Sequence, residues 1–308
     1  MEDRPRKNKH WHILGAGSVG CLWAASLADK GLTIEIILKD EAMQSQSGRS
    51  GHLTLVSQGQ ASKYPVSYTS PALINQPISH LILCTKAQDA LNALSGIADH
   101  IDDKTRILLL QNGMGSQQAI IKTFPQYKIW VGSMTDGAYL KERFNVCHAG
   151  KGQTYIGPFT QAATPDDFDA LISDFRLDVR YSNTIEKQLW SKLAINCCIN
   201  GLTALFNCRN GALLDNDERQ QRLNELIEET ASVLASSGKA IHELKENVYQ
   251  VCQKTAGNIS STCQDARQNR TTELAYINQY LIQYATDRGL EVKSHRRLIK
   301  ELQERDIH

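Results

Sequence analysis

The sequence predicts the fold class α/β plus all-α, with an N-terminal Rossmann-type dinucleotide-binding domain followed by a C-terminal helical domain. The chain has 308 residues, which is more than one hydrophobic core usually supports. Short apolar runs alternate with amphipathic segments across residues 10–183, as in βαβ units with a largely parallel sheet. Long helical patterns dominate residues 184–308 instead. Residues 1–9 are charged and lack an apolar run, so we expect a disordered tail there.

The individual elements follow from the period of the apolar residues. In the first domain, strands are predicted at residues 11–14, 33–38, 80–84, 106–110 and 128–132, and helices at 18–30, 87–100 and 116–123. Alternation within residues 48–70 predicts an antiparallel excursion. Gly150 and Gly152 predict a turn that pairs a strand at 145–148 with one at 153–156. In the second domain, helices are predicted at 184–206, 217–237, 240–255 and 269–288.

Charge and composition argue against several classes of protein. The 34 basic and 33 acidic residues give a formal net charge of +1, so no long-range field favours nucleic acid or an anionic membrane. The longest run of low charge, residues 193–206, is too short to span a bilayer, and the first residues lack the apolar stretch of a secretory signal. The eight cysteines show no metal-ligand spacing. We therefore expect a cytoplasmic protein with reduced thiols and no metal site.

The stretch "HWHILGAGSVGCLWAASLADKG" contains three glycines that follow an apolar strand and open a helix. In that context Gly15 permits the tight turn, Gly17 lets the backbone approach a pyrophosphate, and Gly20 allows the helix to pack closely on the strand. The alternative is a glycine turn without a ligand. The predicted dinucleotide contacts are Gly15, Ala16, Gly17, Ser18, Val19 and Gly20.

Polar residues at the ends of three predicted strands bear on the cofactor. After the second strand, Lys39 suits the 2′-phosphate of NADP, whereas Asp40 beside it suits the ribose hydroxyl of NAD. A solvated charge pair is the alternative for both. In "LCTKAQD" and "LLLQNGMG", Lys86 and Asn112 follow strands at the edge where open α/β sheets bind ligands, and both could face a nicotinamide. Helix caps and turn residues are the alternative there.

A polar stripe crosses an otherwise apolar helix in "LWSKLAINCCINGLTALFNCRNG". Lys192, Asn196 and Asn200 recur at four-residue steps and therefore share one helix face. Burying these groups costs free energy unless partners satisfy them, so a cleft is the natural place for the stripe. A lysine in an apolar setting has a lowered pKa and can donate a proton to a developing alkoxide. The alternative is a set of structural amides with a snorkelling lysine.

A second group of polar residues lies in "NISSTCQDARQNRTTELAYINQYL". Asn258, Ser260 and Ser261 precede a predicted helix that carries Glu273, and hydroxyls at a helix start suit a carboxylate. Glu273 could orient Lys192 or bind a substrate hydroxyl. Solvent exposure is the commoner fate of such a glutamate.

Five ordered motifs resemble those of the ketopantoate reductases, or 2-dehydropantoate 2-reductases. They are "GAGSVG", "LCTKAQD", "QNGMG", "LWSKLAINCCINGLTALFNCRNG" and "NISSTCQDARQNRTTELAYIN", and the likeness covers nearly the whole chain. The resemblance implies an oxidoreductase with a Rossmann domain, a helical domain and an active site between them. It implies NADPH-dependent reduction of ketopantoate to pantoate, a step of pantothenate and coenzyme A biosynthesis.

The resemblance also implies roles for particular residues. Lys192 matches the proton donor, and Glu273 matches the acidic residue that helps hold the substrate, the lysine and the cofactor. The implied substrate contacts are Asn112, Lys192, Asn196, Asn200, Asn210, Asn258 and Ser261. The implied cofactor contacts beyond the glycine turn are Lys39, Lys86, Asn112, Ala138 and Glu273.

Two residues depart from the family pattern. Lys39 stands where relatives often have arginine, so the bidentate grip on a phosphate is lost and discrimination against NADH weakens. Asp136 stands where many relatives have a neutral polar residue, which adds a negative charge near the expected cleft. Because Asp136 could alter the pocket, reduction of another branched 2-keto acid is one alternative function. A protein of a different class, which senses NADP without catalysis, is the other. The expected partner is a small 2-keto acid, without nucleic acid or membrane, and the chain is expected to be a monomer or homodimer.

Overall fold

The computed structural model describes residues 9–40, 45, 48–165, 167–168 and 175–308. The chain divides into two compact units. The first comprises Met1–Gln111 and Ser116–Ile185, and the second comprises Asn112–Gly115 and Glu186–His308. The predicted tail at residues 1–9 lies, apart from Lys9, outside the described residues.

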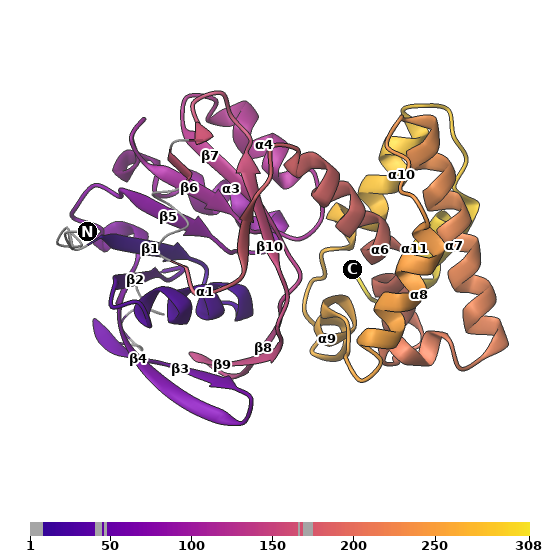
Figure 1. Ribbon diagram of the computed structural model, residues 1–308, viewed down its shortest axis with the longest axis horizontal. Coiled ribbons are helices and arrows are strands. Elements are labelled where there is room, and N and C mark those ends of the chain that lie inside the picture. Colours follow the sequence, from indigo (N-terminus) through magenta and orange to yellow (C-terminus); the bar gives the residue numbers. More distant parts are fainter. Residues whose placement is uncertain (1–8, 41–44, 46–47, 166, 169–174) are drawn as a thin grey trace, which may run out of the picture. The chain divides into compact units, whose positions relative to one another are not determined.

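The first unit is built on one sheet of eleven strands within the described residues, in the order β11-β10-β7-β6-β5-β1-β2-β4-β3-β9-β8 (Figure 1). The strands are β1 His10–Leu14, β2 Thr33–Ile37, β3 Ser50–Ser57, β4 Gln60–Thr69, β5 His80–Leu83, β6 Arg106–Leu109, β7 Lys128–Met134, β8 Gly137–Glu142, β9 Asn145–Gly150, β10 Thr154–Pro158 and β11 Val179–Tyr181. The run from β7 through β6, β5, β1 and β2 to β4 is parallel. The predicted Rossmann-type class is confirmed.

Helices α1 (Ser18–Ala28), α3 (Ala87–Ser95) and α4 (Ser116–Thr123) connect the parallel strands. Helix α1 packs on β1 and β2 and also contacts β3, β8 and β9. At these last three strands the sheet curves beneath the helix (Figure 1). The core on this side is aromatic, with the Trp23 ring 4.6 Å and the Trp11 ring 5.4 Å from that of Phe175. Burial of such rings is a main source of stability, because each removes a large apolar area from water.

The antiparallel excursion predicted at residues 48–70 is confirmed, since β3 pairs with β4 from Ser50↔Ser67 to Ser57↔Gln60. The pairing predicted between residues 145–148 and 153–156 is wrong. Strand β9 pairs with β3 and β8, whereas β10 pairs with β7 and β11. Gly152 packs directly on the backbone of Thr135, where a Cβ would lie 2.3 Å from the carbonyl carbon. The residues after β9 therefore pair along β7 instead of turning back on β9.

The second unit is all-helical in its described secondary structure. Its helices are α6 Ile185–Leu205, whose first residue belongs to the first unit, α7 Asp217–Ser236, α8 Leu244–Lys254, α9 Ser261–Arg267, α10 Asn278–Thr286 and α11 Lys293–Gln303, with short 3-10 turns η3 Asn210–Leu213 and η4 Leu274–Tyr276. The continuous helix predicted at residues 269–288 is wrong. Helix α9 ends where Arg270 N bonds back to Asp265 O and Asn269 takes a positive φ of 49°, so the chain reaches α10 only after a non-helical stretch and η4.

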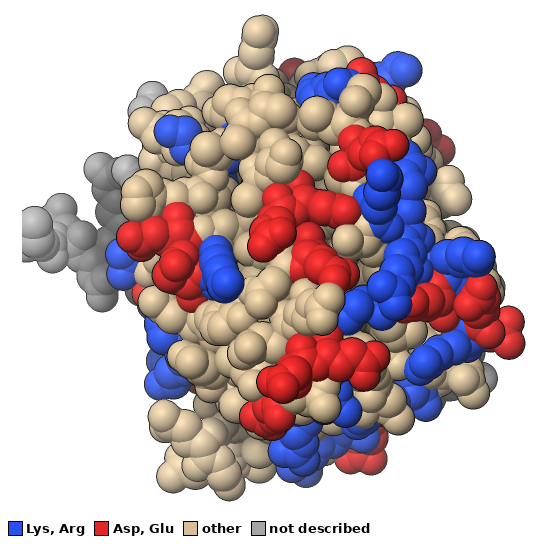
Figure 2. All heavy atoms as spheres, turned by 90° about the vertical axis from the view of Figure 1, so that its right-hand side faces the viewer, with Lys and Arg blue, Asp and Glu red and all other residues tan. Residues whose placement is uncertain are grey.

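Acidic and basic side chains lie in neighbouring groups on the face of the helical unit in Figure 2. In the helical unit, Glu301 of α11 forms ion pairs with both Arg222 and Arg297. This intermixing matches the near-zero net charge of the chain. Among the described residues, no helix is both long enough and apolar enough to cross a membrane.

Candidate active site

The glycine turn joins β1 to α1 and brings the backbone into close contact at two of its three glycines. Gly15 has a φ of +110°, and a Cβ there would lie 2.7 Å from Thr85 N. A Cβ on Gly20 would lie 2.0 Å from Gly15 O, whereas one on Gly17 would meet no atom within 4 Å. Helix α1 starts after Gly17 with no side-chain cap and no acidic residue in its first turn. Because the first amide groups of a helix have no partner within the helix, the start of α1 and the open approach at Gly17 are compatible with a dinucleotide phosphate.

The other predicted cofactor residues lie on several elements of the first unit. Lys39 and Asp40 are exposed just after β2. Lys86 is the N-cap residue of α3 and directly follows Thr85, the neighbour of Gly15. Three small or apolar residues pack against the hydrophobic core of the first unit, namely Ala16, Val19 and Ala138.

A hydrogen-bonded chain joins the three polar groups expected to do the chemistry, all of them in the second unit. Lys192 Nζ donates to Asn112 Oδ1 at 2.7 Å, and Asn112 Nδ2 donates to Glu273 Oε2 at 3.1 Å. Burial lowers the pKa of Lys192 to about 8, while the nearby Glu273 carboxylate raises it. Asn112 therefore links the ammonium to the carboxylate.

A short loop holds Asn112 in this position. Although it follows β6 in sequence, Asn112–Gly115 belongs to the second unit, where Met114 N donates to Tyr276 O at 2.8 Å. Gly113 has a φ of +76°, and a Cβ there would lie 2.2 Å from the same Tyr276 oxygen. Only glycine fits this approach. The signal in the sequence is the glycine of "QNGMG", but its partner Tyr276 could not be read from the motif.

Glu273 differs from its prediction in its secondary structure. It lies just before η4 rather than within a helix, and its side chain is buried, with the residue only 8% exposed. The backbone of Glu273 accepts from Tyr276 N at 2.9 Å, which closes the turn. The carboxylate is thus held by the same segment that holds the Asn112 loop.

The polar stripe on α6 continues beyond Lys192 as predicted from the four-residue spacing. The side-chain amides of Asn196 and Asn200 make no hydrogen bond within the part of the chain that the structure describes. Thr203 Oγ1 bonds both the Asn200 carbonyl, at 2.9 Å, and Ser260 Oγ, at 2.7 Å. The end of the stripe is therefore tied to the start of α9.

The polar residues around α9 differ in their hydrogen bonds and in their exposure. Ser260 Oγ accepts from Cys263 N at 3.1 Å, so this hydroxyl caps the helix instead of facing a ligand. Ser261 and Asn258 are exposed. Asn210 N donates to Asn258 O at 3.0 Å and Asn210 Nδ2 to Thr255 Oγ1 at 2.9 Å, which leaves Asn210 Oδ1 without a partner among the described residues.

Asp136 has partners of its own in the first unit. Its Oδ1 lies 2.8 Å from His148 Nε2 and accepts from Gly152 N at 3.0 Å. The side chain is only 3% exposed. The Asp136 carboxylate therefore joins the start of β8 to β9 and to the residues that follow β9. The sequence alone did not indicate this structural role.

Comparison with known proteins decides the family. The protein-family model described as "Ketopantoate reductase PanE/ApbA" matches residues 11–161. A second family model, described as "Ketopantoate reductase PanE/ApbA C terminal", matches residues 184–306. The chain belongs to the ketopantoate reductase family. It is 34% identical over 283 residues to the 2-dehydropantoate 2-reductase of Vibrio cholerae serotype O1, covering 90% of this chain and 91% of that protein. It is 33% identical over 292 residues to the Escherichia coli O157:H7 enzyme of that name, covering 94% and 92%.

Solved structures agree with this membership of the ketopantoate reductase family. The crystal structure of a probable 2-dehydropantoate 2-reductase from Bacillus subtilis matches with a TM-score of 0.81 and 27% identity, over 96% of this chain and 99% of that one. A D-mandelate dehydrogenase with NADH and anilino(oxo)acetate matches with a TM-score of 0.86 over 97% and 98%. At 22% identity, that second likeness concerns the fold alone.

Proposed function

We propose that this ketopantoate reductase family member is an NADPH-dependent 2-dehydropantoate 2-reductase, which reduces ketopantoate to pantoate for pantothenate and coenzyme A biosynthesis. The observation that carries the proposal is the hydrogen-bonded chain from Lys192 through Asn112 to Glu273. A lysine with a pKa of about 8 is protonated at neutral pH, yet it releases a proton more readily than an ordinary lysine. Relatives named 2-dehydropantoate 2-reductase support the assignment of the substrate.

In this mechanism Lys192 is the general acid. The nicotinamide, when bound, supplies the hydride that reduces the C2 ketone. Lys192 Nζ gives its proton to the oxygen as negative charge develops there, and Asn112 Oδ1 orients the ammonium through its 2.7 Å hydrogen bond. Glu273 keeps the lysine protonated until transfer, because its carboxylate raises the pKa that burial lowers.

The rest of the stripe and the start of α9 are proposed to bind the substrate. The amides of Asn196 and Asn200 have no partner in the described chain and can bond a hydroxyl or keto oxygen. Exposed polar groups before and at the start of α9, on Asn258 and Ser261, suit the substrate carboxylate and hydroxyl. The unpaired Oδ1 of Asn210 adds one acceptor.

The domain roles and the setting of the protein complete the proposal. Residues 10–183 would bind the cofactor through the glycine turn, Lys39, Lys86 and Ala138, and residues 184–308 would bind the substrate. The loop Asn112–Gly115 would serve both ligands, since Asn112 is also a predicted cofactor contact. All eight cysteines are free thiols, which supports a cytoplasmic protein. It would act as a monomer or homodimer.

Replacing Lys192 tests the mechanism. Loss of a general acid costs about 10²- to 10⁴-fold in rate, so Lys192→Ala should lower kcat for ketopantoate reduction by that factor. Lys187→Ala, an exposed lysine on the same helix, is the matched control and should keep full activity. Near-normal reduction by Lys192→Ala would contradict the assigned role. Specificity constants for simpler 2-keto acids complete the series, and a clear preference for one of them would overturn the assigned substrate.

The role of Lys39 is tested by following NADPH and NADH oxidation in parallel with ketopantoate. Lys39→Ala should raise KM for NADPH with little effect on NADH, because a charge that meets only the 2′-phosphate is lost. Lys63→Ala, an exposed lysine on β4, serves as the control. Equal use of the two cofactors by the unmodified enzyme would refute the assignment of Lys39.

A further inference from the structure

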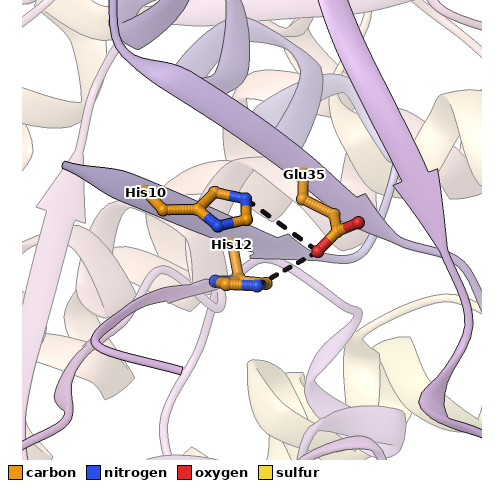
Figure 3. Close-up of side chains that lie close together, drawn as sticks. All are labelled: His10, His12 and Glu35. Carbon is orange, nitrogen blue, oxygen red and sulfur yellow. Dashed lines mark ion pairs between the residues drawn. The ribbon is translucent and has the colours of Figure 1, made fainter. Parts of the chain in front are cut away.

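Two histidines of β1 and a glutamate of β2 meet on one face of the sheet in the first unit. His10 and His12 are two residues apart on β1 and so point to the same side, and Glu35 lies opposite His12 in the register with β2. Figure 3 shows both rings on that side, each with a nitrogen turned toward the Glu35 carboxylate. One ligand atom from each of the three residues lies within 4.8 Å of the others.

The contacts inside this cluster leave polar atoms unsatisfied. His12 Nε2 lies 3.2 Å from Glu35 Oε2, but His10 Nε2 is 3.9 Å away, too far for a hydrogen bond. His10 Nε2 and His12 Nδ1 are enclosed and have no hydrogen-bond partner among the described residues. Enclosed nitrogens without hydrogen-bond partners cost free energy. A metal ion between the three side chains would bind His10 Nε2, the unpartnered nitrogen that faces Glu35.

We propose that His10, His12 and Glu35 bind a divalent transition-metal ion of the zinc class. Two imidazoles and one carboxylate suit Zn²⁺ and its neighbours, whereas Mg²⁺ and Ca²⁺ prefer oxygen ligands throughout. Ligand atoms in a tetrahedral zinc site lie about 3.3 Å apart, given bonds of about 2.0–2.1 Å. Glu35 Oε2 lies 3.2 Å from His12 Nε2 and 3.9 Å from His10 Nε2, and one ligand atom from each residue lies within 4.8 Å of the others, so His10, whose side chain is 39% exposed, would turn inward to complete the site.

The site would join β1 to β2 and so stabilise the first unit. It precedes the end of β1 at Leu14, after which the glycine turn begins, and its three residues belong to the first unit, whereas Lys192 and Glu273 belong to the second. Three protein ligands leave a fourth position for water. The cysteine and histidine spacing did not indicate this site, because Glu35 reaches the histidines only through the pairing of β1 with β2.

The test measures metal binding without turnover, so its outcome is independent of the reductase proposal. The full chain, without a histidine tag and stripped by chelator, is titrated with Co²⁺ followed by visible absorption and then with competing Zn²⁺. We expect one equivalent to bind and Zn²⁺ to displace it. His10→Ala and Glu35→Gln should each weaken binding by at least about tenfold.

His242→Ala is the matched control, because it removes an exposed histidine that also lies beside a glutamate, at 3.5 Å from Glu243. This variant should bind Co²⁺ as the unmodified chain does. His10 is preferred to His12 as the site of substitution because its side chain is 39% exposed, whereas that of His12 is 2% exposed. The proposal is overturned if the unmodified chain binds no stoichiometric Co²⁺, or if His10→Ala and Glu35→Gln bind it unchanged.

Discussion

Substituting Gly113 should disable the enzyme although this residue carries no chemical group. In Gly113→Ala the new Cβ would lie 2.2 Å from Tyr276 O, and real Cβ atoms essentially never approach a heavy atom closer than 3.0 Å. The loop or Tyr276 must therefore move by about 0.8 Å, the difference between these two distances. A misplacement near 1 Å can cost about 10²-fold in rate, and Asn112 is the adjacent residue. We expect kcat to fall by about that factor.

The assay separates displacement of Asn112 from simple backbone strain. Gly238 has a similar φ of +66° in the same unit, but a Cβ there meets nothing within 4 Å. Gly238→Ala thus adds the cost of a left-handed residue, about 1–2 kcal/mol, without a clash. Steady-state oxidation of NADPH with ketopantoate should show wild-type kcat for Gly238→Ala and the loss only for Gly113→Ala. Equal activity of the two variants would refute the reasoning.

Two further predictions concern pH. The rate of ketopantoate reduction should be flat below pH 8 and fall tenfold per pH unit above it, because Lys192 must be protonated to donate and its pKa is about 8. Glu273→Gln should shift the fall in rate to lower pH, since the Glu273 carboxylate raises the pKa of Lys192. A flat profile to pH 10 would exclude Lys192 as the acid. His295 is buried between Thr230 Oγ1 and Asn278 Nδ2, and burial lowers its pKa to about 4, so below pH 6.5 the unfolded chain takes up a proton that the folded chain does not. The second unit should therefore lose about 2 kcal/mol of its free energy of unfolding by pH 5, measured by hydrogen exchange in α7 and α11. The His295→Gln variant should lose less stability over the same pH range. An equal loss in that variant would show that other groups cause the pH dependence.

Patterns within single elements were predicted well. The strands of the parallel sheet, the glycine turn and the stripe of Lys192, Asn196 and Asn200 each depend on residues a few positions apart, whose relation is set by the 2.0 or 3.6 residue period. The errors came where contacts with distant parts of the backbone determine the structure. Strands β9 and β10, for example, pair with other strands rather than with each other. The stretch before α10 is a similar case, because Asp265 and Asn269 end α9 where the periodicity continued.

The sequence by itself determined the class of fold, the glycine turn after β1 and the helical stripe that carries Lys192, since each depends on residues close together in the chain. Only the tertiary structure decided how these groups are held. Lys192 meets Asn112 across 80 residues, and Asn112 meets Glu273 across 161. Such contacts depend on the path of the whole chain, through the close approach of Gly113 to Tyr276. In the same way His10 and Glu35 become neighbours only because two strands pair in one register.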